Sequence, residues 1–518
     1  MNPYMVRSAT QGLANYVNLA SGQGASAVIA HDSRRYSDVF SLEAALVLCA
    51  NGIKTFLFQE LRPTPVLSFA VRHLKATTGI VVTASHNPAE YNGYKVYWND
   101  GAQVLPPHDV GIIEEVRKTQ GHSRSMSKEE ALAKGLLVYV QDEIDAAYRT
   151  MVKGQVLRSE LFRSDAGKLK VVYTALHGTG ITELPPIMKE LGVNMILVPE
   201  QAISDGNFPT VVSPNPEEKS AMALGLALAQ KSEADLLLGT DPDADRLGIG
   251  VPGPQGWQLL NGNELGALLT DYVFMSLKEL GKLPAHPVFI NTIVTTELHH
   301  LIARKYGAKT YKVYTGFKYI AEKIREFEQN GNKETFIFGN EESYGFLIGT
   351  SVRDKDAISA SALTIEMALY HRRNGRSVLD ALNALYQEFG YFHEIQISKT
   401  FKGQAGVEKM KNFMSKVRQT PPKTIGSLPL ASFRDYLNGT TMDADGRKLK
   451  DIELPSSDVL QFALADGSLV TVRPSGTEPK IKFYASCRAP QGTPLEKAKK
   501  DVDAKLAAID AELDVWIQ

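Results

Sequence analysis

Three aspartates stand at every second position of the run Asp241-Pro242-Asp243-Ala244-Asp245-Arg246. On an extended segment this spacing points all three side chains to one side. Adjacent carboxylates repel one another unless a cation neutralises them. Oxygen-only ligands suit Mg²⁺, which often completes its coordination shell with a substrate phosphate. The run therefore predicts a Mg²⁺ site made by Asp241, Asp243 and Asp245.

Two other acidic motifs do not fit this run. An EF-hand loop starting at Asp241 would need glycine at its sixth position and glutamate at its twelfth, where the chain has Arg246 and Pro252. A phosphatase with an aspartate nucleophile would need threonine or valine two residues after the second aspartate of its pair. Arg246 and Leu247 follow Asp245 instead. The remaining alternative is a solvated acidic turn.

A serine that could carry a phosphate lies in the run Thr83-Ala84-Ser85-His86-Asn87-Pro88. Because His86 adjoins Ser85, we expect the two side chains to diverge, which argues against a Ser-His hydrolase pair. No Gly-x-Ser-x-Gly elbow surrounds Ser85 either. A phosphoserine fits better, since its phosphate carries a charge of about −1.5 to −2 and could bind the metal of the aspartates. Lys95 could serve as a cation or proton donor, or be an ordinary surface lysine.

Two further polar clusters could bind a phosphorylated sugar. The run Arg473-Pro474-Ser475-Gly476-Thr477-Glu478-Pro479-Lys480 combines cations, hydroxyls and a glycine amide, as a phosphate cradle does. Alone it could be an ordinary polar turn. In the run from Gly339 to Gly345, Glu341 and Ser343 are two residues apart and could share one face toward sugar hydroxyls.

One glycine-rich turn resembles a dinucleotide fingerprint only in part. Gly178 and Gly180 have the right spacing, but Glu183 occupies the position of the third glycine. Glu200 could imitate the acidic residue that binds a ribose. A tight turn between a strand and a helix is the better interpretation.

Short apolar runs precede these clusters and alternate with amphipathic stretches, which is typical of an α/β fold. The clearest runs span residues 27–30, 79–82, 169–173, 236–239 and 336–338. Ligands of open α/β sheets bind beyond the carboxyl ends of the strands, where each cluster lies. This combination of a strand and a following polar cluster recurs at intervals of roughly a hundred residues, which suggests related domains. We expect domains at 1–153, 154–256, 257–389 and 390–518.

The overall composition excludes several classes of protein. The chain has 518 residues, of which 43% are hydrophobic and 22% charged, and its net charge is −1. It therefore has no global basic excess for nucleic acid. Cys49 and Cys487 form no disulfide framework or zinc set and fit a reducing compartment. No apolar run reaches the roughly 18 residues of a membrane span, and the start has no signal-like apolar region. We expect a cytoplasmic monomer or homodimer.

Together the four motifs resemble those of the α-D-phosphohexomutase superfamily. They occur in that family's order, one in each domain, and cover nearly the whole chain: a phosphoserine loop from Thr83 to Pro88, a metal loop from Asp241 to Arg246, a sugar loop from Gly339 to Gly345 and a phosphate loop from Arg473 to Lys480. The longer runs from Ser85 to Trp98 and from Glu341 to Gly345 resemble the bacterial phosphoglucomutase branch related to animal phosphoglucomutase-2 and phosphopentomutase.

This resemblance implies an α/β protein of four domains around a central cleft, three similar α/β units and a smaller α+β domain. It implies that Ser85 is phosphorylated and binds Mg²⁺ together with Asp241, Asp243 and Asp245. Members usually begin with a strand that carries a Gly-Leu-Arg-Gly-like segment. This chain starts at Met1 near the first helix, so that strand and its active-site arginine are expected to be absent.

The resemblance also implies roles for single residues. His86 and Lys95 match positions that assist proton transfer, and Arg246 would contact the substrate or the phosphoserine. Thr315-Gly316-Phe317-Lys318 matches a loop near the substrate. The residues that would hold the sugar and the phosphate not being transferred are Lys318, Glu341, Ser343, Arg473, Ser475, Gly476 and Thr477.

The implied activity interconverts glucose 1-phosphate and glucose 6-phosphate. A hexose phosphate is the expected substrate, and glucose 1,6-bisphosphate is the expected intermediate and activator. Phosphomannomutase and phosphopentomutase activities stay open, because the loop sequences do not decide the sugar epimer. The expected loss of the first strand also leaves open a sugar-phosphate-binding protein without turnover.

Overall fold

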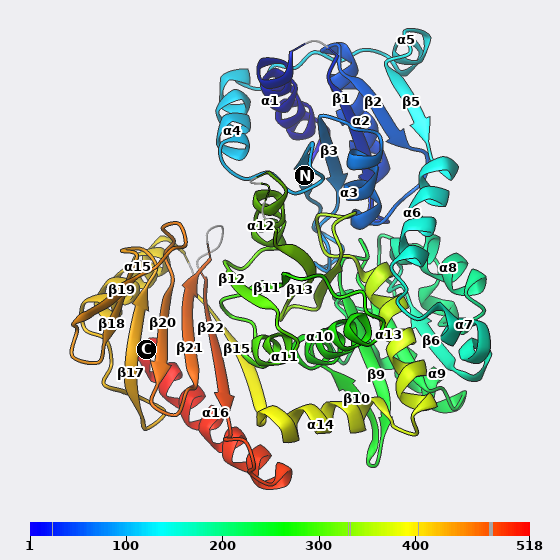
Figure 1. The fold of residues 1–518 in the computed structure, drawn as a ribbon. Coiled ribbons are helices and arrows are strands. Elements are labelled where there is room, and N and C mark those ends of the chain that lie inside the picture. Colours follow the sequence, from blue (N-terminus) through cyan, green and yellow to red (C-terminus); the bar gives the residue numbers. More distant parts are fainter. Residues whose placement is uncertain (23, 330, 332, 402, 476–479, 518) are drawn as a thin grey trace. The chain divides into compact units, whose positions relative to one another are not determined.

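The computed structural model describes residues 1–518 except 23, 330, 332, 402, 476–479 and 518 (Figure 1). The chain divides into two compact units. The larger unit comprises Met1–Thr292 and Ala303–Leu379, and the smaller one comprises Ile293–Ile302 and Asp380–Gln518.

The first sheet of the larger unit has the strand order β4-β3-β1-β2-β5. All residues of β1 after the first are buried, as expected of a central strand covered on both faces. Helix α1 begins after Asn2, whose side chain accepts a hydrogen bond from the amide of Met5, and it packs against α4 (Figure 1). The elements are β1 (Ser26–His31), β2 (Lys54–Phe58), β3 (Thr78–Val82), β4 (Tyr94–Trp98), β5 (Leu137–Val140), α1 (Pro3–Ser21), α2 (Ser37–Ala50), α3 (Thr64–His73), α4 (His108–Thr119), α5 (Lys128–Ala133) and α6 (Asp142–Gly154).

The second sheet has the strand order β10-β9-β8-β6-β7. Its strand β8 is buried along its whole length and leads into the aspartate run. The elements are β6 (Lys170–Thr174), β7 (Asn194–Leu197), β8 (Leu236–Thr240), β9 (Leu247–Gly253), β10 (Gly256–Leu260), α7 (Ser159–Asp165), α8 (Leu184–Glu190), α9 (Ala223–Lys231) and the 3₁₀ helices η1 (Ala166–Lys168), η2 (Thr179–Thr182) and η3 (Pro199–Gln201).

The third sheet has the strand order β12-β11-β13-β14. Helix α10 begins with a capping box, in which the side chains of Asn261 and Glu264 each accept a hydrogen bond from the other's backbone amide. The elements are β11 (Pro287–Thr292), β12 (Lys309–Val313), β13 (Thr335–Glu341), β14 (Gly345–Ile348), α10 (Gly262–Glu279), α11 (Leu298–Lys305), α12 (Phe317–Gln329) and α13 (Ala357–Arg373).

The three sheets repeat one four-strand pattern. In each, a central strand pairs in parallel with two neighbours, and one neighbour turns back into an antiparallel strand. The antiparallel pairs are β3–β4, β8–β9 and β13–β14. The parallel pairs are β1–β2, β1–β3, β6–β7, β6–β8, β11–β12 and β11–β13. This pattern confirms three similar α/β units.

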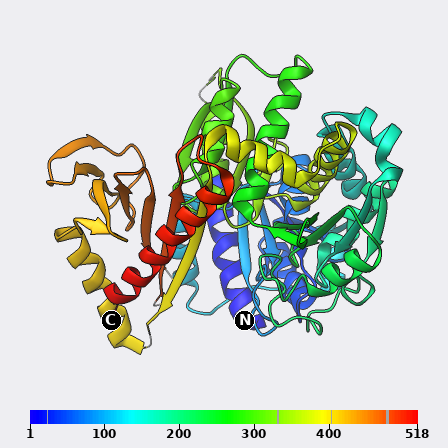
Figure 2. The same ribbon diagram turned by 90° about the horizontal axis from the view of Figure 1, so that it is seen from below.

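The smaller unit is an α+β domain around one sheet, and all of its described strand pairs are antiparallel. Its strands follow the order β15-β22-β21-β20-β17-β18-β19, and β16 pairs with β17. Helix α16 runs along β15 and β22, and its buried leucines share a core with those strands (Figure 2). The elements are β15 (Phe392–Thr400), β16 (Thr424–Ile425), β17 (Leu428–Asp435), β18 (Thr440–Asp443), β19 (Lys448–Asp451), β20 (Leu460–Leu464), β21 (Leu469–Pro474), β22 (Lys480–Arg488), α14 (Val378–Phe389), α15 (Gly403–Gln419) and α16 (Leu495–Ile517).

The apolar runs chosen from the sequence correspond to β1, β3, β6, β8 and β13, so these strands are confirmed. The turn at Gly178 leads into the short helix η2, as the turn interpretation predicts. Among the described helices, none has the length and apolar character needed to cross a membrane.

A buried carboxylate ties the segment between α6 and α7 to two helices of the larger unit. Glu366 of α13 accepts hydrogen bonds from the amides of Leu157 and Arg158 and from the hydroxyl of Tyr272 in α10. Burial raises the pKa of Glu366 to about 7, although these hydrogen bonds act in the opposite direction. The folded chain therefore keeps a proton that the unfolded chain releases near pH 4.5.

Glu366→Gln is expected to make the stability of the protein less dependent on pH. With the folded pKa raised, the stabilising contribution is present below about pH 4.5 and is lost as the pH rises through about 7. Urea unfolding midpoints measured between about pH 4.5 and 8 should fall less steeply for the variant than for the wild type. Parallel curves would contradict this role of Glu366.

Candidate active site

Three loops at corresponding places of the three sheets meet in the larger unit. They connect β3 to β4, β8 to β9 and β13 to β14. The first carries Ser85 and the second the three aspartates, and Glu341 is the last residue of β13, directly before the third. The hydroxyl of Ser85 donates to Asp241 Oδ2 at 2.7 Å. Arg246 forms an isolated β-bridge with Gly345, the first residue of β14. Residues from three parts of the sequence therefore form one site.

The aspartates converge on a tight loop and not on the extended segment that the sequence predicts. Ala244 adopts a left-handed conformation with φ 51°, which reverses the backbone between Asp243 and Asp245. Asp241 Oδ1 accepts hydrogen bonds from the amides of Asp245 and Arg246 at 3.1 and 3.0 Å. Carboxylate oxygens of the three residues lie within 4.8 Å of one another, so the expected cluster forms by a different local geometry.

Two lysines balance the buried carboxylates. Lys95 Nζ lies 2.9 Å from Asp243 Oδ2, and Lys355 Nζ lies 3.1 Å from Asp245 Oδ2. Burial by itself would lower the pKa of each lysine, but the carboxylates outweigh it and raise both pKa values. Burial and mutual repulsion raise the pKa of Asp241, whereas Lys95 overcomes burial and lowers that of Asp243. Both lysines are therefore cations at neutral pH.

The aspartate cluster fits a hard divalent cation. Within the described part of the chain, Asp243 Oδ1 and Asp245 Oδ1 are buried and make no hydrogen bond. Buried carboxylate oxygens without a donor are costly unless a cation approaches them. Together with Asp241 and the hydroxyl of Ser85 they offer the oxygen-only ligand set that suits Mg²⁺. The cluster could thus hold a metal ion.

The geometry of Ser85 and His86 corrects the sequence interpretation. The two side chains do not diverge, since Ser85 Oγ lies 3.2 Å from His86 Nδ1. The left-handed backbone at Ser85, with φ 51°, accompanies this approach. Burial and then the nearby Arg246 lower the pKa of His86 to about 3, so its imidazole is neutral at pH 7 and can accept a proton. Ser85 Oγ also donates to Asp241 of the acidic cluster, and a Ser-His hydrolase pair does not require such a contact.

Arg246 lines the same site from the second loop, and Glu341 lines it from the end of β13. Arg246 Nη1 pairs with Glu217 Oε1 at 2.6 Å, while its Nε lies 3.8 Å from Asp245 Oδ1. Glu341 Oε1 accepts the amide of Gly316 at 2.7 Å. Burial raises the pKa of Glu341 to about 7, and Lys355 opposes that shift. Glu341 is therefore poised between its two protonation states near neutral pH.

The remaining sequence-predicted residues lie in different places. Lys318 is the second residue of α12, two positions after Gly316, and Ser343 lies half-buried in the third loop. Arg473 lies near the end of β21 in the smaller unit, where the amide of Ser475 donates to Lys480 O at 2.7 Å. Gly476 and Thr477 lie outside the described residues.

Two residues of the site escaped the sequence interpretation. Thr64, at the start of α3, donates its hydroxyl to Asp243 Oδ2 and its amide to Asp243 O, both at 2.9 Å. Lys355 follows the third loop and also pairs with Asp354 at 3.2 Å. Thr64 and Asp243 are 179 positions apart, and nothing local marks such contacts. The acidic run did signal that some cation must be near, but not which lysine supplies it.

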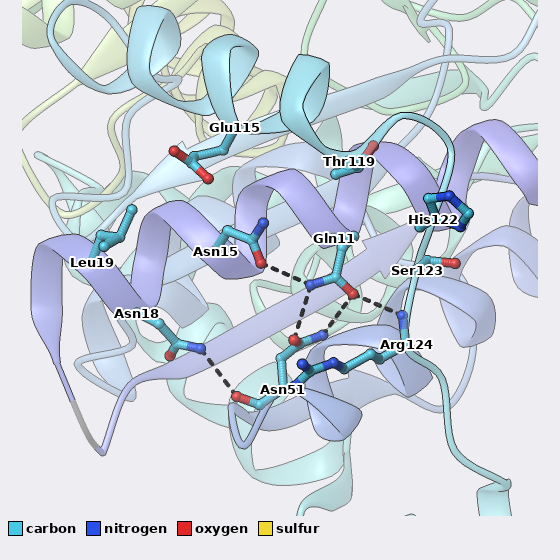
Figure 3. Close-up of a pocket in the computed structure, with 10 residues that line it drawn as sticks. All are labelled: Gln11, Asn15, Asn18, Leu19, Asn51, Glu115, Thr119, His122, Ser123 and Arg124. Atoms are coloured by element: carbon cyan, nitrogen blue, oxygen red, sulfur yellow. Dashed lines mark hydrogen bonds between the residues drawn. The ribbon is translucent and has the colours of Figure 1, made fainter.

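A separate pocket of about 660 Å³ lies between α1, α4 and the loop after α4 (Figure 3). Its amide side chains mostly satisfy one another. Gln11 and Asn51 exchange hydrogen bonds, and Gln11 also donates to Asn15 and accepts from the amide of Arg124. The pocket contains none of the residues of the acidic cluster, and we regard it as separate from the candidate active site.

Models of four protein domains match the chain. They are described as the α/β/α domains I, II and III and the C-terminal domain of phosphoglucomutase/phosphomannomutase. They match residues 1–122, 146–253, 261–389 and 436–505.

Curated relatives match most of the chain. A phosphoglucomutase of Staphylococcus saprophyticus is 36% identical over 490 residues, which are 94% of this chain and 87% of the relative. A phosphoglucomutase of Staphylococcus aureus strain MRSA252 is 38% identical over 496 residues, which are 95% of this chain and 87% of the relative.

Solved structures with low sequence identity share the fold. The open form of parafusin, a phosphoglucomutase of Paramecium, matches with a TM-score of 0.69 and 18% identity over 98% of this chain and 91% of its own. A phosphoglucomutase/phosphomannomutase family protein of Burkholderia thailandensis matches with a TM-score of 0.65 and 19% identity over 98% and 94%.

Thr64→Val is expected to weaken Mg²⁺ binding about tenfold, because a metal ligand would lose the hydroxyl that orients it. Valine keeps the shape of threonine, and Thr64→Ser keeps the donor and should bind Mg²⁺ as the wild type does. Calorimetric titration with Mg²⁺ measures the Mg²⁺ affinities of the two variants and the wild type without any turnover. Equal affinities for the valine variant and the wild type would remove Thr64 from the site.

Proposed function

The chain belongs to the phosphoglucomutase/phosphomannomutase family, and on that premise we propose that it interconverts glucose 1-phosphate and glucose 6-phosphate through phosphorylated Ser85. The single observation that carries this proposal is the 2.7 Å contact between Ser85 Oγ and Asp241, at the edge of three buried carboxylates. A serine in that position can carry a phosphate only if a cation neutralises its surroundings. The curated phosphoglucomutases, 36 and 38% identical, support the choice of reaction.

The proposed reaction has two phosphoryl transfers. In the first, the bond between Ser85 Oγ and phosphorus breaks, and a new bond forms to the free hydroxyl of the hexose phosphate. The hydroxyl gives up its proton, the departing Ser85 oxygen takes one up, and the products are glucose 1,6-bisphosphate and free Ser85. The bisphosphate then turns end for end and returns its other phosphate to Ser85. Positioning and charge neutralisation do most of the catalytic work in such transfers.

The site residues divide these tasks among them. Asp241, Asp243, Asp245 and the oxygen of Ser85 would hold Mg²⁺, whose charge stabilises the transferring phosphoryl group. The neutral imidazole of His86, 3.2 Å from Ser85 Oγ, is proposed to pass the proton of the sugar hydroxyl on to Ser85 Oγ, and to pass a proton the other way in the second step. Lys95 stays protonated between Asp243 and Asp245 and serves as a fixed cation.

Substrate recognition is assigned to two further groups of residues. Glu341 and Ser343 are proposed to bind sugar hydroxyls, with Lys318 and Arg246 close to the phosphorylated end of the sugar. A second phosphate site, which must accept either phosphate in turn, is proposed at Arg473, Ser475, Gly476 and Thr477. Traces of glucose 1,6-bisphosphate are expected to activate the protein by phosphorylating Ser85. We also propose domain boundaries near residues 153, 256 and 389.

Turnover of glucose 1-phosphate, mannose 1-phosphate and ribose 1-phosphate, measured in parallel with Mg²⁺ and a trace of glucose 1,6-bisphosphate, tests the proposal. Glucose 1-phosphate should be the fastest substrate. Faster turnover of mannose 1-phosphate or ribose 1-phosphate would show that this sugar phosphate, and not glucose 1-phosphate, is the substrate. If the folded protein turned over none of the three sugar phosphates, the result would support a sugar-phosphate-binding role and contradict the proposed activity.

Ser85→Ala should abolish turnover while the fold is kept, because the variant has no oxygen to carry the phosphate. Ser123→Ala, which changes a serine exposed on the same domain, is the matched control and should keep full activity. Circular dichroism of both variants checks the fold. Wild-type activity of the Ser85 variant would exclude a phosphoserine mechanism at this position.

A further inference from the structure

The loop that carries Ser85 contains little regular structure, yet its backbone carbonyls converge on one point. Residues 83–93 connect β3 and β4, and their few internal hydrogen bonds include those from Asn87 to Ala84 and from Tyr91 to Pro88. Four carbonyl oxygens, those of Ser85, Asn87, Pro88 and Tyr91, face the interior of the domain. Buried carbonyls need hydrogen-bond donors, so a group that binds all four fixes the loop.

A single guanidinium group binds all four carbonyls. Nη1 of Arg34 donates to Pro88 O at 2.8 Å and to Tyr91 O at 2.9 Å. Nη2 donates to Ser85 O at 2.6 Å and also to Asn87 O. The planar fork of arginine can bind four acceptors at once, whereas the ammonium group of lysine offers three donors from one atom.

Arg34 is itself held from two sides. Its Nε lies 3.1 Å from Asp32 Oδ2, and both side chains are completely buried. On the other side, the ring of Phe208 lies 4.9 Å from the guanidinium carbon. A carboxylate and an aromatic face together compensate for the burial of the positive charge.

The segment with Phe208 also contacts the loop directly. Ser213 donates its hydroxyl to His86 O at 3.0 Å, and Gly206 forms a bridge with Arg34. A Cβ at Gly206 would lie 2.5 Å from the amide of Arg35, so only glycine allows this approach. Residues 206–213 therefore lie against the loop, although they belong to the second sheet's domain.

We propose that Arg34 is the positioning residue of the phosphoserine loop, and that residues 206–213 of the second domain hold it in that role. The inference rests on the proposed function of Ser85. Arg34 binds the carbonyl of Ser85 itself and thereby aims its hydroxyl at Asp241. A displacement of about 1 Å at a reacting atom can cost about a hundredfold in rate. Arg34 acts on the reaction through Ser85 and touches no reacting atom.

Arg34→Lys tests the inference, because it keeps the charge beside Asp32 and removes the fork. We expect kcat and the rate of Ser85 phosphorylation by glucose 1,6-bisphosphate to fall about a hundredfold, with KM changed less than about threefold. Arg7→Lys, on the outside of the same domain beside Glu43, is the matched control and should leave both rates unchanged. Wild-type rates in the folded Arg34→Lys variant would overturn the inference.

Amide hydrogen exchange separates positioning from general stability and does not depend on activity. In Arg34→Lys, exchange should quicken in the peptide that covers residues 83–93 and stay unchanged in α10 and in β20 to β22. Exchange that is faster throughout the protein would mean that Arg34 has a purely structural role. Unchanged exchange in residues 83–93 would contradict any role of Arg34 in ordering the loop. If the wild type neither turns over nor becomes phosphorylated, the proposed function fails, while this exchange result still decides whether Arg34 orders the loop.

Phe208→Leu is the second variant, should Arg34→Lys fold poorly. It keeps an apolar side chain under the guanidinium group and removes only the aromatic face. A smaller decrease in kcat, with the same localised increase in exchange, is expected. Wild-type kcat and exchange in this variant would exclude the second domain from positioning the loop.

Discussion

Three carboxylates, almost completely buried within a few ångströms of one another, are the constraint on which the larger unit depends. Such a cluster is unfavourable unless cations compensate it, and each compensating group comes from a different part of the chain. Lys95 comes from the first sheet, Arg246 from the aspartate loop itself, and Lys355 follows the third sheet. Among the described residues, cations lie at the flanks of the cluster, while Asp243 Oδ1 and Asp245 Oδ1 have no hydrogen-bond donor. That unequal compensation is what suits the cluster to a metal ion.

A repeated topology brings these groups together. Each of the three sheets turns from a buried parallel strand into an antiparallel partner, and the functional residues lie in the connecting loop or directly before it. The same structural position thus supplies a hydroxyl at Ser85, carboxylates at Asp241 to Asp245 and a further carboxylate at Glu341. Left-handed residues in these loops, Ser85 and Ala244 among them, turn the backbone sharply enough to present side chains and amides at one point. Three versions of one loop therefore divide the binding of metal, phosphate and sugar that we propose.

The sequence predicted the parts that depend on local pattern. Buried strands such as β1 and β8 follow from their apolar runs, and the aspartate spacing indicated a metal site. It failed where backbone conformation decides the outcome. Spacing does not reveal the left-handed turn at Ala244, nor the approach of His86 to Ser85, which local sequence led us to exclude. It also missed Thr64, Lys355 and Arg34, because their contacts join residues far apart in the chain and depend on tertiary packing.

The central claim is that phosphorylated Ser85 donates its phosphate to one end of the sugar and takes back the phosphate of the other end. Mapping of phosphopeptides by mass spectrometry, on protein taken during turnover of glucose 1-phosphate with Mg²⁺, tests this most directly. The account predicts one phosphate per chain, on the peptide that contains Ser85, and its loss when excess glucose 6-phosphate is added without the bisphosphate. Steady turnover with no phosphate on Ser85, or with the phosphate on another residue, would contradict the account.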